Sequence, residues 1–191
     1  MPENVAVVQK SLARDDVERV FLHAGVMEIA EDAFRDWDSL QEVVFAKGSR
    51  LETIGAHAFA RTALREFTAP SGLKEICDGA FMNCKSLKEV RLNEGLERIG
   101  DDGDGAFQGS GVETVQIYSR LQKMGERTFL NCRKLRQVEI SRDCEIDIKR
   151  YVPASVEICW VKLLEPTTGD EETIQKKRDS SETQRLWEEM Q

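Results

Sequence analysis

The chain has 191 residues, 40% of them hydrophobic and 32% charged, which is the composition of an ordinary globular protein. Its formal net charge of −8 disfavours contact with phosphate backbones, so nucleic acid is not expected as a partner. No apolar run approaches the roughly 20 residues that span a bilayer, so we expect no membrane insertion.

Targeting and redox signals are equally plain. The first ten residues, MPENVAVVQK, lack the basic start and apolar stretch of a secretory signal, which predicts a cytoplasmic protein, or a cell-surface one if the chain is a fragment of a longer polypeptide. Five cysteines without a C-x-x-C pair argue against a disulfide framework and a zinc site. We expect reduced, buried thiols and no cofactor.

Residues 1–16 are predicted to form a short N-terminal capping helix. Val5, Val8 and Leu12 recur at roughly helical spacing. A repeat array needs such caps because each of its ends exposes a hydrophobic cross-section. This segment is therefore expected to cover the first coil.

From residue 17 onward one unit repeats. Blocks that begin with the pattern L-x-x-I end at phenylalanines spaced by 25, 22, 26 and 22 residues, namely Phe34, Phe59, Phe81, Phe107 and Phe129. Each is followed by an L-x-x-V-x-L block, whose last part alternates with the period of a half-buried strand. These patterns predict an α/β solenoid of mostly short parallel strands, with five to six repeats over residues 17–161 and the five phenylalanines in one internal column.

The full unit, L-x-x-I-G-x-x-A-F-x-x-C-x-x-L-x-x-V-x-L, resembles the BspA-like branch of the leucine-rich-repeat family. The best matches run over residues 73–92 and 121–140, where Cys84 and Cys132 hold the cysteine position, while the links after Phe59 and Phe107 are shorter and drop it. The resemblance implies a right-handed leucine-rich-repeat coil and a role in adhesion or protein binding.

Small residues in the unit have a mechanical interpretation. Gly55, Gly100 and Gly125 follow the isoleucine or methionine of their blocks, and alanines precede most of the phenylalanines. A larger side chain at these places would hold adjacent coils apart. Cys84 and Cys132 are expected to be core residues rather than reactive thiols.

The outward positions of the strands are the predicted binding surface, on the concave side of the coil. The predicted binding residues among them are Arg19, Phe21, Glu42, Val44, Glu66, Thr68, Glu89, Arg91, Thr114, Gln116 and Tyr118. Glu42, Glu66 and Glu89 form an acidic column beside the apolar Phe21 and Val44, and an apolar anchor rimmed by charge is typical of a protein interface. The pattern favours a basic or amphipathic peptide. The alternative is that these glutamates only keep a sheet face soluble.

The insertion over residues 101–105, DDGDG, is a weak candidate for metal binding. Asp102 and Asp104 resemble the start of a calcium loop. The later acidic ligand is missing, because Gly111 and Val112 stand near where a glutamate belongs. We expect a solvated acidic loop and no metal site.

The C-terminal part changes character twice. Residues from about 141 to 161 read as a degenerate final turn that caps the solenoid, with Trp160 covering its edge. Residues 162–191 are polar and charged, which predicts a flexible or weakly helical tail. The alternative is a partner-binding helix anchored by Trp187.

These features together favour a non-catalytic protein-protein interaction module, monomeric by default. No constellation of nucleophile, base and oxyanion donors is visible in the sequence, so no catalytic residues are expected. The alternative is a structural spacer or adhesion-type domain of a longer, possibly surface-displayed protein.

Overall fold

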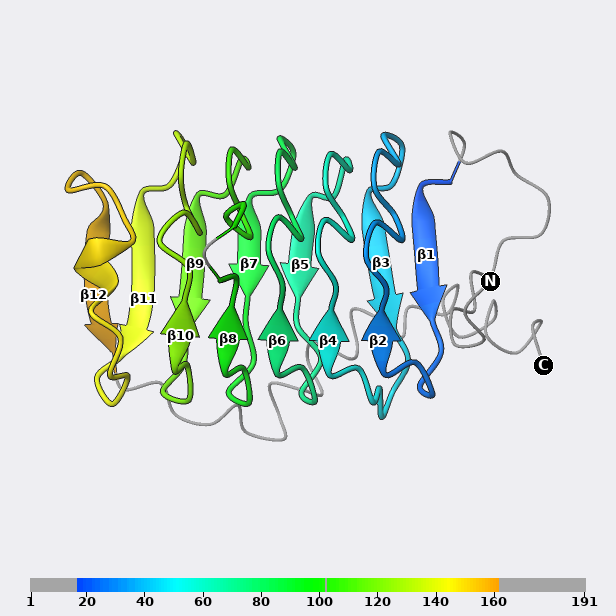
Figure 1. Ribbon diagram of the computed structural model, residues 1–191, viewed down its shortest axis with the longest axis horizontal. Helices are drawn as coiled ribbons and strands as arrows, with labels where there is room; N and C mark the ends of the chain where they lie inside the picture. Colours follow the sequence, from blue (N-terminus) through cyan, green and yellow to red (C-terminus); the bar gives the residue numbers. More distant parts are fainter. Residues whose placement is uncertain (1–16, 102, 162–191) are drawn as a thin grey trace.

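The computed structural model describes residues 17–101 and 103–161 (Figure 1). They form a parallel β-solenoid of about six turns, and every strand pairing among them is parallel. The predicted capping helix of residues 1–16 and the tail of residues 162–191 lie outside the described residues. Within the described ranges the helical structure is a single 3₁₀ turn, Ile148–Arg150, so the coils themselves are built from strands and turns.

One strand of each coil has three to five residues, and these strands make up what we call the long-strand layer. Its members are β1 (Arg19–Leu22), β3 (Glu42–Phe45), β5 (Glu66–Thr68), β7 (Glu89–Arg91), β9 (Thr114–Ile117), β11 (Gln137–Ser141) and β12 (Glu157–Val161). They correspond to the L-x-x-V-x-L blocks, in which alternate apolar residues point into the core.

A second layer of two-residue strands, the short-strand layer, faces the first. It is one continuous five-stranded sheet of β2 (Glu28–Ile29), β4 (Thr53–Ile54), β6 (Glu75–Ile76), β8 (Arg98–Ile99) and β10 (Lys123–Met124). The sequence predicts a loop here, because two residues are too few to display a period of two. In Figure 1 these strands lie in front of the long ones and run in the opposite direction.

The five repeat phenylalanines form one continuous stack between the layers. Successive ring centroids lie 5.2, 5.4, 5.2 and 5.8 Å apart, with interplanar angles between 6° and 16°. Each side chain is at most 1% exposed. Phe67 joins the column from the side, with its ring centroid 4.7 Å from that of Phe81. Aromatic stacking therefore ties each coil to the next through the interior.

A left-handed residue follows each stacked ring by two positions. These residues are Asp36, Arg61, Asn83, Gly109 and Asn131, with φ between 59° and 66°. The backbone N–H groups of the first four donate to carbonyl oxygens of the following coil at 2.8–2.9 Å. The left-handed turn is thus a repeated element that aims a hydrogen bond at the neighbouring coil, and Asn and Gly are the residues that adopt it most easily.

Close approach between coils explains the small residues of the unit. A Cβ atom on Gly55 would lie 2.7 Å from the backbone nitrogen of Glu31, and one on Gly125 would lie 2.1 Å from the backbone oxygen of Asp101. Gly105 is tighter still, at 1.6 Å from the carbonyl oxygen of Arg127. At these three places a side chain would collide with the backbone of an adjacent coil.

The long-strand layer is interrupted once. Strands β1 and β3 form a two-stranded sheet, and β5 begins a separate five-stranded one, whereas the short-strand layer runs on without a gap. At this step the phenylalanine changes its place in the L-x-x-V-x-L block. Phe45 of β3 stands at the last apolar position of its block, whereas Phe67 of β5 stands at the middle one. Their rings meet edge to face at 6.1 Å. We attribute the break to this mismatch in side-chain volume.

Candidate interaction surface

The outward side chains of the long-strand layer stand in rows because the strands are in register. One row carries Glu66, Glu89, Thr114, Gln137 and Glu157, and the next carries Thr68, Arg91, Gln116, Glu139 and Cys159. Adjacent parallel strands lie about 4.8 Å apart, so neighbouring members of a row can touch. The sequence-predicted residues from β5 to β9 therefore share one face.

The apolar anchor expected at the N-terminal end of this surface is not exposed. Phe21 and Val44 are register partners on β1 and β3, but they are only 3% and 7% exposed. Alternation correctly separates them from the inward Val20 and Leu22, and neither belongs to the core cluster. The prediction of an open apolar patch is wrong because strand alternation gives the direction of a side chain and says nothing about what lies over it.

The three glutamates of the acidic column differ in whether a nearby arginine neutralises them. Glu42 accepts from Arg19 Nε at 2.6 Å, and Glu89 pairs with Arg91 at 2.7 Å. Glu66 is exposed and has no ion-pair partner within residues 17–101 and 103–161. Glu66 and Glu89 are direct register neighbours, whereas Glu42 lies across the break in the layer.

A polar network continues the surface toward the C-terminal end. The Tyr118 hydroxyl donates to Gln116 Oε1 at 3.3 Å, and Gln116 Nε2 donates to Glu139 at 3.3 Å. Gln137 Nε2 donates to the other oxygen of Glu139 at 3.0 Å. Burial, followed by the charges of Glu94 and Glu139, raises the pKa of Tyr118. The predicted site includes Tyr118 and Gln116 but leaves out Glu139, an outward residue of the next strand that accepts hydrogen bonds from both Gln116 and Gln137.

The cysteine position of the repeat is a buried hydrogen-bonding site, not a reactive one. Cys84 Sγ donates to the carbonyl oxygen of Phe59 and Cys132 Sγ to that of Phe107, both at 3.0 Å. Thr62 and Ser110 fill the same position in the coils with short links and lie 3.4 and 3.5 Å from these sulfurs. The sequence-based view that those coils drop the position is therefore wrong.

The thiols themselves are protected by the core. Burial raises the pKa of both Cys84 and Cys77 to about 11, so neither is a thiolate near neutral pH. Cys84 is fully buried, and Cys77 lies in the position after Ile76 with its side chain half-buried. Their surroundings suit packing rather than nucleophilic chemistry.

The acidic insertion contacts a histidine. Asp104 Oδ2 lies 3.2 Å from His57 Nε2, and the main-chain oxygen of Asp104 accepts from the Gly79 N–H at 2.8 Å. His57 thus contacts a residue that lies 47 positions later in the chain. Across the described residues, no group of three or more His, Cys, Asp or Glu side chains could hold a metal ion, and Asp102 lies outside them.

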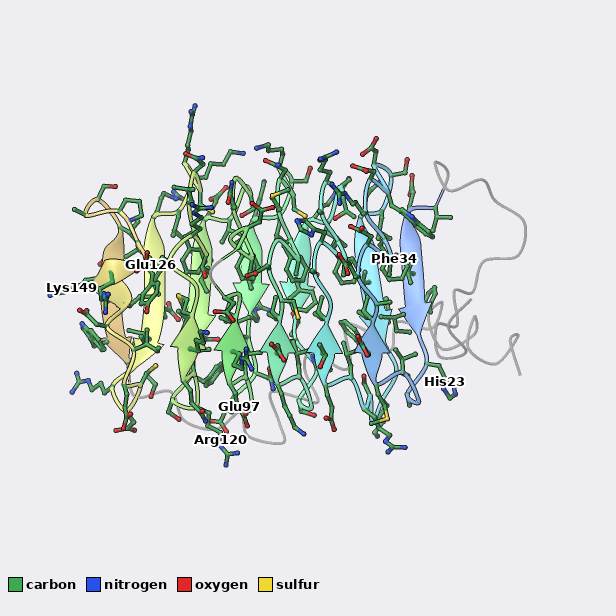
Figure 2. All side chains as sticks on the ribbon, in the orientation of Figure 1. His23, Phe34, Glu97, Arg120, Glu126 and Lys149 are labelled. Atoms are coloured by element: carbon green, nitrogen blue, oxygen red, sulfur yellow. The ribbon has the colours of Figure 1, made fainter. Side chains whose placement is uncertain are left out.

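The C-terminal coil contributes β12, which forms the C-terminal edge of the long-strand layer among the described residues. Trp160, predicted to cover this edge, is itself 43% exposed, and its carbonyl oxygen lies 3.4 Å from Arg142 Nε. Figure 2 shows Lys149 at this end of the solenoid and His23 at the opposite end, beside β1. The candidate surface therefore extends from the end of the solenoid at β1 to the end at β12.

The family profile of the BspA-type leucine-rich-repeat region matches residues 7–135 in six copies. The chain belongs to this family. A search of curated proteins finds no match to the chain. BspA-type leucine-rich repeats are typically protein-interaction or surface-adhesion modules, so the family supports protein partners in general.

Solved structures agree with the fold. The leucine-rich-repeat protein of T. pallidum is 23% identical with a TM-score of 0.60, covering 86% of this chain and 84% of its own. The pneumococcal vaccine antigen PcpA is 23% identical with a TM-score of 0.60, covering 66% of this chain and 31% of its own. A leucine-rich-repeat protein of Eubacterium ventriosum is 23% identical with a TM-score of 0.58, covering 68% of this chain and 33% of its own.

This BspA-type chain spans about a third of the length of the last two proteins. At these identities the likeness concerns the architecture. Among the residues that the structure describes, no helix has the length and apolar character needed to cross a membrane.

Proposed function

We propose that this chain is a non-catalytic protein-interaction module that binds a basic or amphipathic polypeptide on the outer face of its long-strand layer. The observation that carries the proposal is the charge of the outward positions from β5 to β12. They hold four carboxylates, Glu66, Glu89, Glu139 and Glu157, against one cation, Arg91.

The arrangement of these charges favours a cationic ligand. Glu66 and Glu89 face each other directly across paired strands, and like charges so placed destabilise the pair. Arg91 pairs with Glu89 alone, so a lysine or arginine crossing the strands here would pair with Glu66, reduce the remaining repulsion and give both specificity and faster association.

Rigidity is the second support. The strands of this face are held in register by parallel ladders between neighbouring strands and by the phenylalanine stack beneath them. The five strands from β5 to β12 present a face about 20 Å wide. A preorganised face loses little conformational freedom on binding, so more of the contact energy appears as affinity.

The test compares two triple variants of equal charge change. Glu66→Gln, Glu89→Gln and Glu139→Gln alter the proposed face, whereas Glu28→Gln, Glu31→Gln and Glu126→Gln remove three exposed carboxylates elsewhere. Calorimetry with a lysine-rich amphipathic peptide should show about tenfold weaker binding for the first variant, since each exposed ion pair contributes about 0.2–1 kcal/mol.

The control triple variant should bind like the parent. Equal affinity of the two triple variants would refute this surface, and failure of the parent to bind any lysine-rich peptide would refute a basic partner. A glutamate-rich peptide of the same length serves as the negative control.

A structural spacer or adhesion-type domain is the second candidate function. It is favoured by the comparison with PcpA and the Eubacterium ventriosum protein, in which an equivalent stretch makes up about a third of the chain. Reading the complete open reading frame and locating the protein by cell fractionation would separate a surface-displayed domain from a cytoplasmic module.

A further inference from the structure

Phe21 and Val44 are an apolar pair on the face of the sheet that points away from the core. Their neighbours Val20, Leu22 and Phe45 belong to the core cluster, and alternation turns Phe21 and Val44 to the opposite face. Yet Phe21 is only 3% exposed and Val44 only 7%. The pair is therefore a covered apolar surface, distinct from the polar surface of the proposed function.

No described strand or helix makes a large contact with this side of the sheet. Among residues 17–101 and 103–161, the main element contacts of β1 and β3 run to their neighbours within the long-strand layer. The corresponding outward positions on other strands are polar and at least partly exposed, as at Thr68, Arg91 and Gln116. Phe21 and Val44 depart from the repeat in a way that an overlying apolar segment would explain.

We propose that the C-terminal segment, residues 162–191, docks on Phe21 and Val44 through Trp187. Trp187 is the one aromatic residue in the parts of the sequence outside the described ranges. Leu186 and Met190 stand beside it at a spacing typical of one helix face. An aromatic ring on Phe21 combines a large buried area with a favourable ring–ring contact.

The chain is long enough for this contact. The long-strand layer has six spacings between β12, where the described part ends at Val161, and β1. At about 4.8 Å each, they amount to about 29 Å. The 26 residues from Val161 to Trp187 span about 39 Å even if fully helical, and more if extended. Docking would link the last coil to the first.

The N-terminal residues are the competing occupant. They precede β1 directly and include Val5, Val8 and Leu12. However, the family profile already counts residues from 7 onward within the repeat array, whereas it leaves the C-terminal segment unassigned. The segment with Trp187 is therefore the better candidate for the outer face.

The experiment uses the full chain with a single tryptophan. Trp37→Phe and Trp160→Phe leave Trp187 as the only indole. In the folded protein its emission should be blue-shifted, and its acrylamide quenching constant should be several-fold smaller than in the urea-unfolded chain. If the emission maximum and the quenching constant of Trp187 equal those of the unfolded chain, the proposal is overturned. The same result is expected if the N-terminal segment, rather than Trp187, covers Phe21.

Two further variants locate the contact. In the same background, Val44→Ser should raise the quenching constant toward the unfolded value, while Gln116→Ser, on the same layer, should leave it unchanged. Circular dichroism checks that each variant is folded. If Trp187 is protected but Val44→Ser and Phe21→Ala both leave the protection intact while folded, the docking site lies elsewhere and the proposal fails.

Discussion

Phe81 is the most connected ring of the aromatic column. It stacks between Phe59 and Phe107 and also contacts Phe67. We expect Phe81→Ala to lower the free energy of unfolding by about 3–5 kcal/mol, because the substitution removes a large, fully buried side chain and leaves a cavity between two stacked rings. Urea denaturation followed by circular dichroism measures the change.

The control for this prediction is Met82→Ala, which truncates the adjacent, half-buried residue. A loss of less than about 1 kcal/mol for Phe81→Ala, or an equal loss for Met82→Ala, would mean that the column does not hold the coils together.

Single positions also show where sequence reasoning succeeds and fails. The phenylalanines are predictable because five copies in one register identify them as buried. Thr62 and Ser110 are missed because a hydroxyl group does not resemble cysteine in a pattern, although both side chains are buried at this position and contact the cysteine sulfur of the next coil. For Phe21 the sequence predicts the outward direction of the side chain correctly, but it does not predict that the side chain is buried.

Within a coil, glycine acts in two separable ways. Gly105 is needed for space, because a Cβ atom there would lie 1.6 Å from the carbonyl oxygen of Arg127, whereas Gly48 is needed for its φ of +71° and has open space around it. We expect Gly105→Ala to destabilise the protein by at least about 3 kcal/mol and Gly48→Ala by about 1 kcal/mol.

Thermal or urea unfolding of the two variants measures the difference. Similar losses for both would indicate that the coils can separate locally to admit a methyl group, against the close contact described at Gly105. The comparison is matched, because both substitutions restrict the unfolded chain equally.

The two layers of strands differ in how visible they are in the sequence. The block around each long strand carries three apolar positions, and the last two lie two residues apart, so the existence and direction of the strand follow from the pattern. A short strand has two residues, and its conformation is imposed by pairing with the coil on either side rather than by its own composition.

Across the whole molecule, the break between β3 and β5 divides the long-strand layer into unequal parts. Arg65 N donates to Gln41 O at 3.3 Å at this step, before the paired segment of β5 begins. We expect backbone amides of β3 and β5 that face the break to exchange with deuterium several-fold faster than those between β7 and β9, because fewer ladder bonds must open.

Hydrogen–deuterium exchange resolved by peptide or by NMR tests this expectation. Uniform protection across all the long strands would contradict it, and would mean that the short-strand layer and the core protect the amides of both parts equally.

At this scale the fold follows from the sequence but the partner does not. The period, the apolar positions and the phenylalanine spacing all indicate the same solenoid, so a single sequence is enough to predict the fold. The interaction surface depends on ion pairs such as Arg19–Glu42 and on contacts over the outer face, which join residues more than twenty positions apart and leave no periodic signal.

The left-handed turns at equivalent places make successive coils interchangeable. Each turn passes its hydrogen bond to the next coil in the same way, whether the residue is Asp36, Arg61, Asn83 or Gly109. A gene encoding such a chain can gain or lose one whole winding by unequal recombination without disturbing the joints on either side. The length of the protein is thus free to evolve separately from its architecture.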